Sequence, residues 1–295
     1  PDPHMKQIRI SGKARKSIDQ LGIEVFPREK SCTQACPACF LAKHHRTLVP
    51  QDIDHRVQEA FSLIEQNIGN RRYDLHFAGD DLTLLPKFKR PELVKYFRFN
   101  FDTKYLKDFS GIEQKLKSIK KLIKFNNLNP GKLAFSIVPK NIFMSREEVL
   151  LIESIVTNLR TWYRGEIEAT VRSNFEKQDF GNSVKKLYIH EKGLISQIMG
   201  HTSDYFYEED NWSSCYLSNF YSKKQKLRIT HRIIKPVKSD YATSVKNDYK
   251  NLATTIIDFA ITPQGVMLGH SSISVADGLT WTTHDDFTNE FKTRV

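Results

Sequence analysis

Three cysteines lie within eight residues near the start of the chain, at Cys32, Cys36 and Cys39. Thiolates separated by three and then by two residues can bind one metal centre from a single loop, as zinc and iron-sulfur sites require. Three local ligands leave a four-coordinate site one ligand short. Either a distant residue completes a structural site, or the open position is available for chemistry.

Three further residues are candidates for a fourth zinc ligand. His44 and His45 follow the cysteine loop directly, although such a pair more often lies at the solvated start of a helix. Cys215 is the remaining cysteine, and we expect it to have no role in a metal site. The sequence alone therefore leaves the completion of the site open.

The charge and composition restrict the class of protein. The chain has 295 residues and a formal net charge of +11, which favours an anionic partner in a general way. No apolar run approaches the about 18–20 residues of a membrane-spanning helix, and no secretory signal is visible. Because the cysteines are few and clustered, we expect free thiols in a reducing cytoplasm rather than a disulfide framework.

Short apolar runs alternate with helical patterns over much of the chain. This alternation is typical of a parallel sheet built from strand-helix units. The predicted strands are Gly22–Pro27, Tyr73–Ala78, Leu133–Val138, Glu166–Arg172 and Val184–His190. Two of the predicted helices are 51–68 and 112–125. A third helix runs to about Tyr163 from an N-cap at Ser145, and Glu148 completes its capping box.

The rest of the chain has a different character. Residues 201–225 are rich in aromatic side chains without a clear period, and we expect a flap or loop. The runs Thr254–Ile261 and Val266–Leu268 predict a hairpin. The expected organisation is therefore an expression remnant followed by the starting Met5 (1–5), a core (6–200), the aromatic flap or loop (201–225) and a C-terminal extension with the hairpin (226–295).

Two motifs together carry a resemblance to a known family. The cysteine loop follows a predicted strand and precedes a helix, and it resembles the cluster loop of the radical S-adenosylmethionine (radical SAM) superfamily. The segment Phe77–Leu85 is similar to the Gly-Gly-Glu-Pro stretch of that family. It departs from the family pattern at Asp80, Asp81 and Leu82, where the family has glycine, glutamate and proline.

The resemblance implies both a fold and an activity. The fold would be α/β, a partial (β/α)6 TIM-like barrel with a short C-terminal hairpin. Cys32, Cys36 and Cys39 would hold a [4Fe-4S] cluster whose open iron binds S-adenosyl-L-methionine, and its reductive cleavage would give a 5'-deoxyadenosyl radical that abstracts hydrogen from a substrate. Residues for which the resemblance implies cofactor contacts are Gly79, Asp80, Asp81, Phe40, Ser136, Arg172 and Asn174.

Partners follow from the resemblance and from the charge. An acidic electron donor of the flavodoxin or ferredoxin type is typical of the family. The hairpin is faintly similar to the start of auxiliary-cluster domains in peptide-modifying members, but it lacks their cysteines. Because of this similarity, a peptide or protein substrate is our first expectation. RNA is the second expectation, because the net charge is +11. Within such an enzyme Cys215 could also donate a hydrogen atom.

A non-enzymatic interpretation stays open at this point. The cysteines with His44, His45 or Cys215 could bind structural zinc in a nucleic-acid-binding protein. Its binding surface would be the aromatic segment and the lysine-rich helix, which carries Lys115, Lys117, Lys120, Lys121 and Lys124. In that protein the Phe77–Leu85 segment would have no role.

Overall fold

The computed structural model describes the parts of the chain from which the strands and two long helices are built. The described residues are 6–9, 20–25, 61–62, 65–66, 69–77, 87–101, 109–137, 145–174, 205–211, 215–234, 256–262 and 265–268. The chain divides into two compact units. The first unit comprises residues 1–13, 101–117 and 131–238, and the second comprises 14–100, 118–130 and 239–295.

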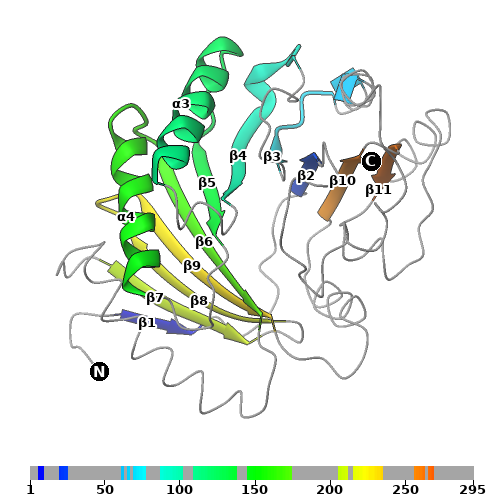
Figure 1. Cartoon of the computed structure of the whole chain (residues 1–295). Helices are drawn as coiled ribbons and strands as arrows, with labels where there is room; N and C mark the ends of the chain where they lie inside the picture. The colour runs from blue at the N-terminus through cyan, green and yellow to red at the C-terminus, as the bar shows by residue number, and fades with distance from the viewer. Residues whose placement is uncertain are drawn as a thin grey trace. The chain divides into compact units, whose positions relative to one another are not determined.

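The sheet of the first unit mixes parallel and antiparallel strands in the order β1-β7-β8-β9-β6-β5 (Figure 1). Strands β5, β6 and β9 are parallel, β8 is antiparallel to both β7 and β9, and β1 is parallel to β7. The bounds are β1 Lys6–Arg9, β5 Lys132–Ile137, β6 Glu166–Asn174, β7 Tyr205–Asn211, β8 Cys215–Ser222 and β9 Leu227–Ile234.

Alternation along β6 gives this sheet two different faces. Ile167, Ala169 and Val171 are buried, whereas Glu168 and Arg172 between and after them are half-buried. Successive side chains of a strand point to opposite faces, so one face of β6 is apolar and the other is polar. Partners in register lie on the same face, so the two faces of β6 extend over β5, β9 and β8.

Helix α4, Arg146–Arg160, begins and ends at defined contacts. The Ser145 hydroxyl accepts from the backbone N–H of Glu148 at 3.2 Å, and the Glu148 carboxylate accepts from the N–H of Ser145 at 2.8 Å. This reciprocal pair is the capping box that the sequence predicts. At the other end, Arg160 donates to the carbonyl oxygens of Gly165, Gln225 and Lys226.

Helix α3, Phe109–Phe125, is amphipathic. Ile112, Leu116, Ile119 and Ile123 are buried at helical spacing. Lys115 is also buried, and its Nζ lies 5.1 Å from the centre of the Phe101 ring. The Phe101 ring in turn contacts Phe135 edge-on with centroids 6.1 Å apart, so these contacts connect α3 to the apolar face of β5.

The sheet of the second unit has the order β4-β3-β2-β10-β11 (Figure 1). Strands β4, β3, β2 and β10 are parallel, and β11 is antiparallel to β10. The bounds are β2 Gln20–Val25, β3 Tyr73–Phe77, the 3-10 helix η2 Pro91–Leu93, β4 Val94–Phe101, β10 Ile256–Thr262 and β11 Gly265–Leu268. Its core is aromatic and includes Tyr73, Phe77, Phe97 and Phe99.

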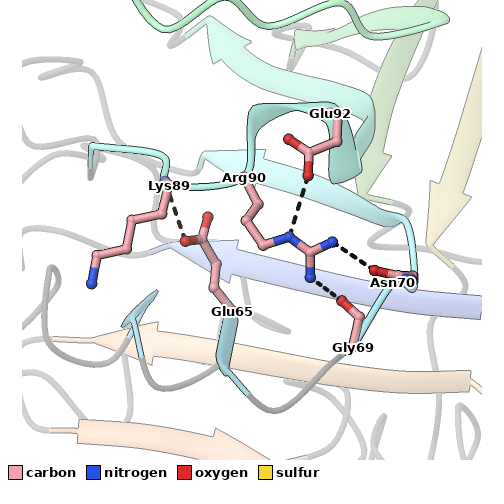
Figure 2. Close-up of polar contacts among 6 residues, drawn as sticks. All are labelled: Glu65, Gly69, Asn70, Lys89, Arg90 and Glu92. Atoms are coloured by element: carbon pink, nitrogen blue, oxygen red, sulfur yellow. Dashed lines mark hydrogen bonds and ion pairs between the residues drawn. The ribbon is translucent and has the colours of Figure 1, made fainter.

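Arg90 ties the chain before η2 to the turn before β3 (Figure 2). Its guanidinium donates to the carbonyl oxygen of Gly69 and, at 2.7 Å, to Oδ1 of Asn70. Its Nε lies 3.2 Å from Oε1 of Glu92. Gly69 has a φ of +63°, so the turn needs the conformational freedom of glycine at this position.

Glu65 is the second link in this region (Figure 2). Its Oε2 accepts from the backbone N–H of Lys89 at 3.2 Å, and its side chain is buried. Burial raises the pKa of Glu65, and the backbone hydrogen bonds of Lys89 and Arg90 oppose that shift. These contacts lie at the amino end of β3 and hold the segments on either side of it together.

Most of the predicted elements that fall on described residues are confirmed. The strands predicted near 22, 73, 133 and 166, the helix 112–125 and the C-terminal hairpin are all present within a few residues of their expected bounds. The helix after Ser145 ends at Arg160, three residues before the expected Tyr163. The predicted strand Val184–His190 and most of the helix 51–68 lie outside the described residues, while 61–62 and 65–66 are helical.

One expectation needs correction. The aromatic segment 201–225 is not a loop in its described part, because Tyr205–Asn211 and Cys215–Ser222 form β7 and β8. Strands β1, β4 and β9 had not been predicted, and β4 is the neighbour of β3 in the sheet. The observed class is a mixed α/β sheet that is open as described, and no helix in the described part is long and apolar enough to cross a membrane.

Candidate functional site

The polar face of the first unit is the richest group of chemically useful side chains among the described residues. Strand alternation and register place its members together. They are Lys132, Ser136, Glu166, Glu168, Thr170, Arg172, Asn219, Tyr221, Arg228, Thr230 and Arg232. We refer to this set as the polar face.

A row of hydrogen-bonding side chains crosses the middle of the polar face. Ser136 pairs in register with Thr170, Thr170 with Thr230, and Thr230 with Asn219. Ser136, Thr170 and Thr230 are all buried. The Thr230 hydroxyl donates to Oδ1 of Asn219 at 2.6 Å. Four neighbouring strands therefore carry polar side chains at one level, where an ordinary core would carry aliphatic ones.

Two arginines lie next to this row, towards the carboxyl ends of two parallel strands. Arg172 of β6 and Arg232 of β9 are partners in register, so their Cα atoms are about 4.8 Å apart. Both side chains are half-buried. The arrangement concentrates two permanent positive charges at one point of the sheet.

Two carboxylates, those of Glu166 and Glu168, lie in the amino-terminal half of the polar face. Lys132 Nζ lies 3.3 Å from Oε1 of Glu166 and 2.8 Å from Oε2 of Glu168. The Thr170 hydroxyl donates to Oε1 of Glu168 at 3.4 Å. Glu166 and Glu168 are therefore paired with Lys132 at one end of the face, and Arg172 and Arg232 lie towards the other end.

Arg228 occupies a separate position on the same face. Its guanidinium carbon lies 5.0 Å from the centre of the Tyr221 ring, which is a cation–π contact. Arg228 is in register with Glu168. It therefore belongs to the amino-terminal, charge-balanced half and not to the arginine pair.

Four of the residues predicted from the sequence fall on described strands of the first unit. Ser136 and Arg172 are both members of the polar face, one in the hydroxyl row and one in the arginine pair. Asn174 ends β6, where its backbone is in register with Ile234. Cys215 begins β8, also in register with Ile234.

The predicted metal and cofactor segments lie outside the described residues, but the strands that lead into them are described. The residues concerned are Cys32, Cys36, Cys39, Phe40, Gly79, Asp80 and Asp81, together with His44 and His45. Strands β2 and β3 are parallel, and Val25 is in register with Phe77. In the sequence, both segments therefore come after the carboxyl ends of two neighbouring strands.

Within the described parts of the chain, no group of three or more His, Cys, Asp or Glu side chains could hold a metal ion. The three cysteines of the predicted cluster loop lie outside these parts of the chain. Three thiolates are a suitable donor set for a zinc ion or an iron-sulfur cluster.

Comparison with known proteins adds nothing to these observations. No family model, curated protein or solved structure matches the chain. The interpretation of the site therefore depends on its residues and their placement.

The second unit carries a smaller polar group near the carboxyl end of β3. His76 Nε2 lies 3.2 Å from Oδ1 of Asn100, and His76 is in register with Arg98 of β4. Sequence reasoning missed both β4 residues because β4 itself was not predicted. The sequence does contain a pattern that indicates this strand, because Tyr96, Arg98 and Asn100 alternate with buried phenylalanines.

Sequence reasoning also missed Arg232 and Thr230. The signal was available in Leu227–Ile234, where Arg228, Thr230 and Arg232 occur at every second position. On the opposite face of β9, His231 is fully buried. Burial lowers the pKa of His231 to about 3, so this histidine is neutral at physiological pH and belongs to the core.

Proposed function

We propose that the protein is a cytoplasmic radical SAM enzyme. The observation that carries the proposal is the parallel pairing of β2 with β3, because in the sequence the three cysteines follow β2 and the Gly79–Asp81 segment follows β3. Loops at the carboxyl ends of neighbouring parallel strands converge on one edge of a sheet, where α/β proteins build their active sites. In this proposal the open sheet is part of a partial (β/α)6 barrel.

Each motif has a defined task in this proposal. Cys32, Cys36 and Cys39 supply three thiolates to a [4Fe-4S] cluster, and Asp81, with Gly79 and Asp80, binds the amino group of S-adenosyl-L-methionine. When bound, the cluster and the cofactor together supply a 5'-deoxyadenosyl radical that removes a hydrogen atom from the substrate. The protein's own contribution is to position the groups and to exclude water.

The polar face supports a role in holding polar ligands. Its hydroxyl row and arginine pair are buried or half-buried, yet hydrophilic. Ser136, Arg172 and Asn174 come from two parallel strands of this sheet, and hydroxyl, guanidinium and amide groups can bind a ribose or a carboxylate. In the partial barrel these strands would turn the polar face inwards. A peptide or protein remains our first substrate class, and RNA the second.

Helix α3 supports an acidic electron donor as partner. Lys117, Lys121 and Lys124 are exposed on one side of the helix, next to Phe125, which is 79% exposed. A positive surface with an apolar residue at its edge suits docking of an acidic flavodoxin or ferredoxin. The same surface is the observation that favours the second candidate, a zinc-stabilised nucleic-acid-binding protein.

Anaerobic reconstitution with iron and sulfide, followed by electron paramagnetic resonance of the reduced protein, tests the proposal. We expect a reduced-cluster signal that changes when S-adenosyl-L-methionine is added, because the cofactor ligates the open iron. The C32A/C36A/C39A variant should give no signal, and the C215A variant should behave as the parent protein does. Stoichiometric zinc binding without a cluster would instead support the second candidate.

An Asp81→Asn variant refines the same experiment. The cluster signal should be retained, whereas the cofactor concentration needed to change it should rise by about tenfold or more, since a charged hydrogen bond to the amino group is lost. An unchanged dependence on cofactor would remove Asp81 from the site. Substrate-dependent formation of 5'-deoxyadenosine with candidate peptides or RNAs would then decide the substrate class.

A further inference from the structure

We infer that the first unit binds single-stranded RNA on a surface made by two segments, residues 160–165 at the end of α4 and residues 223–226 in the turn between β8 and β9. We refer to these two segments as the basic turn surface. They contain no acidic residue, and their cationic side chains are Arg160, Arg164, Lys223, Lys224 and Lys226. The inference goes beyond the proposed function and does not rest on it, because neither a cluster nor a cofactor takes part in the binding.

Hydrogen bonds hold the two segments next to each other. The Arg160 guanidinium donates to the carbonyl oxygens of Gln225 and Lys226, to the second at 2.9 Å. The backbone N–H of Ile167 also donates to the carbonyl oxygen of Lys226, at 2.9 Å. The register of β6 with β9 agrees with these contacts, because Ile167 is the partner of Leu227. The basic side chains of both segments are therefore gathered at the amino ends of β6 and β9.

The charges of the basic turn surface are accessible to an anion. Arg164, Lys224 and Lys226 are exposed, and no carboxylate of the described residues forms an ion pair with any of them. Glu166 follows the first segment directly, but its Oε1 lies 3.3 Å from Nζ of Lys132. The nearest carboxylate in the sequence is thus already paired, and a polyanion can approach the exposed cations.

Lys226 has a backbone conformation that does not favour lysine. Its φ is +49°, in the left-handed region that glycine adopts most readily. A lysine at this position makes the turn less stable than a glycine would. The stability of the turn therefore does not explain this side chain, whereas a contact between its ammonium group and a ligand does.

Two aromatic rings favour a nucleic acid over other polyanions. Trp162 and Tyr163 lie between the arginines of the first segment, both are half-buried, and their ring centroids are 6.1 Å apart. A partly exposed indole can stack on a base while neighbouring cations contact phosphates. An acidic peptide has no base to stack, and a duplex keeps its bases covered. Unpaired bases in a cell belong mostly to RNA, so single-stranded RNA is the partner that fits.

Fluorescence anisotropy with labelled decauridylate tests the inference on the full-length protein without iron, sulfide or S-adenosyl-L-methionine. We expect saturable binding whose Kd rises at least about tenfold between about 50 and 200 mM salt, because phosphate contacts release counterions. Inorganic polyphosphate, polyglutamate and decadeoxyuridylate serve as further probes. Thermal melting of each variant below checks that the fold is retained.

The K226G variant separates binding from stability. It should weaken binding of decauridylate by about threefold or more, yet keep or raise the melting temperature, because glycine is unstrained at this φ. A lysine with a purely structural role would leave the affinity unchanged. W162A should weaken binding of decauridylate by about tenfold but leave the binding of polyphosphate within about twofold, and W162F should restore most of the loss.

A matched pair of variants locates the surface. K223Q/K224Q/K226Q should weaken binding of decauridylate at least about tenfold. K117Q/K121Q/K124Q removes the same charge from the exposed side of α3 and should change the Kd by no more than about twofold. Equal weakening by both variants would show that only the total charge matters and would overturn the inference.

Three further results would overturn it. Decauridylate does not bind to saturation at about 50 mM salt; or polyglutamate binds as tightly as decauridylate, which assigns the surface to an acidic peptide; or decadeoxyuridylate binds at least about tenfold tighter than decauridylate, which assigns it to DNA. Since no cluster is present in this experiment, its failure is distinguishable from a failed reconstitution.

Discussion

His231 is a titratable group without exposure to solvent, and this has a consequence for stability. The pKa of its side chain is lowered from 6.5 to about 3 by burial. Below pH 6.5 the unfolded chain binds a proton that the folded chain does not bind, so the free energy of unfolding decreases as the pH falls from 6.5 towards 3. Above pH 6.5 both states are neutral and this effect is absent.

Urea unfolding at pH 7.5 and pH 5.0 measures the contribution of His231. We expect the parent protein to lose about 2 kcal/mol more than the H231Q variant between these two pH values. H231Q is itself destabilised at both pH values because the site is fully buried, and therefore only the difference between the two pH values is compared. Equal losses of unfolding free energy in the two proteins would contradict the lowered pKa of His231.

Ser136 and Arg172 illustrate how far residue-level prediction reaches. The family resemblance implies a cofactor contact for both, which stays a prediction, and the structure places both on the polar face. Arg232 could not be paired with Arg172 from the sequence, since the two are separated by the strands β7 and β8. Alternation reveals which face a residue occupies, but the register between distant strands is a tertiary property.

At the scale of elements, α4 depends on its capping box. Ser145→Ala removes the acceptor for the Glu148 N–H and should lower the free energy of unfolding by about 1 kcal/mol. Glu148→Gln keeps an acceptor for the Ser145 N–H and should cost less. Glu147→Gln is a matched control, because Glu147 is exposed in the same turn. Denaturant titration gives all three values, and an equal loss in E147Q would exclude the capping contact as the cause.

Two of the strands that sequence reasoning missed, β8 and β4, have interrupted alternation. In β8 the buried positions are Tyr216, Ser218, Phe220 and Ser222, so two of the four inward residues are serines and hydrophobic alternation is lost. In β4 the alternation is broken near Lys95, where the pairing with β3 shifts register between Tyr73 and Asp74. Strands β5 and β6, which pair without such an irregularity, were predicted within a few residues.

At the scale of the whole molecule, the net charge of +11 should control association with an acidic electron donor. If the proposed function is right, the second-order rate of reduction by a reduced flavodoxin should fall at least about tenfold between 50 and 500 mM salt, because salt screens the attraction. Stopped-flow measurement checks this. A rate that does not depend on salt would contradict electrostatic docking.

Two charge-matched variants locate the docking surface. K117E/K121E/K124E changes the exposed side of α3, and K223E/K224E/K226E changes the exposed turn between β8 and β9 by the same amount. A larger decrease of the reduction rate in the α3 variant identifies the helix as the docking surface. Equal decreases of the rate in the two variants would mean that only the total charge matters.

The contacts of Arg160 limit where the protein tolerates added sequence. The turn between β8 and β9 has three exposed lysines and resembles a permissive site for an inserted tag or domain. Its carbonyl groups at Gln225 and Lys226, however, accept hydrogen bonds from Arg160 at the end of α4. An insertion at this turn would separate a hairpin from the helix that supports it, although its side chains point into solvent. Exposure of side chains and freedom of the backbone are thus different properties at this turn.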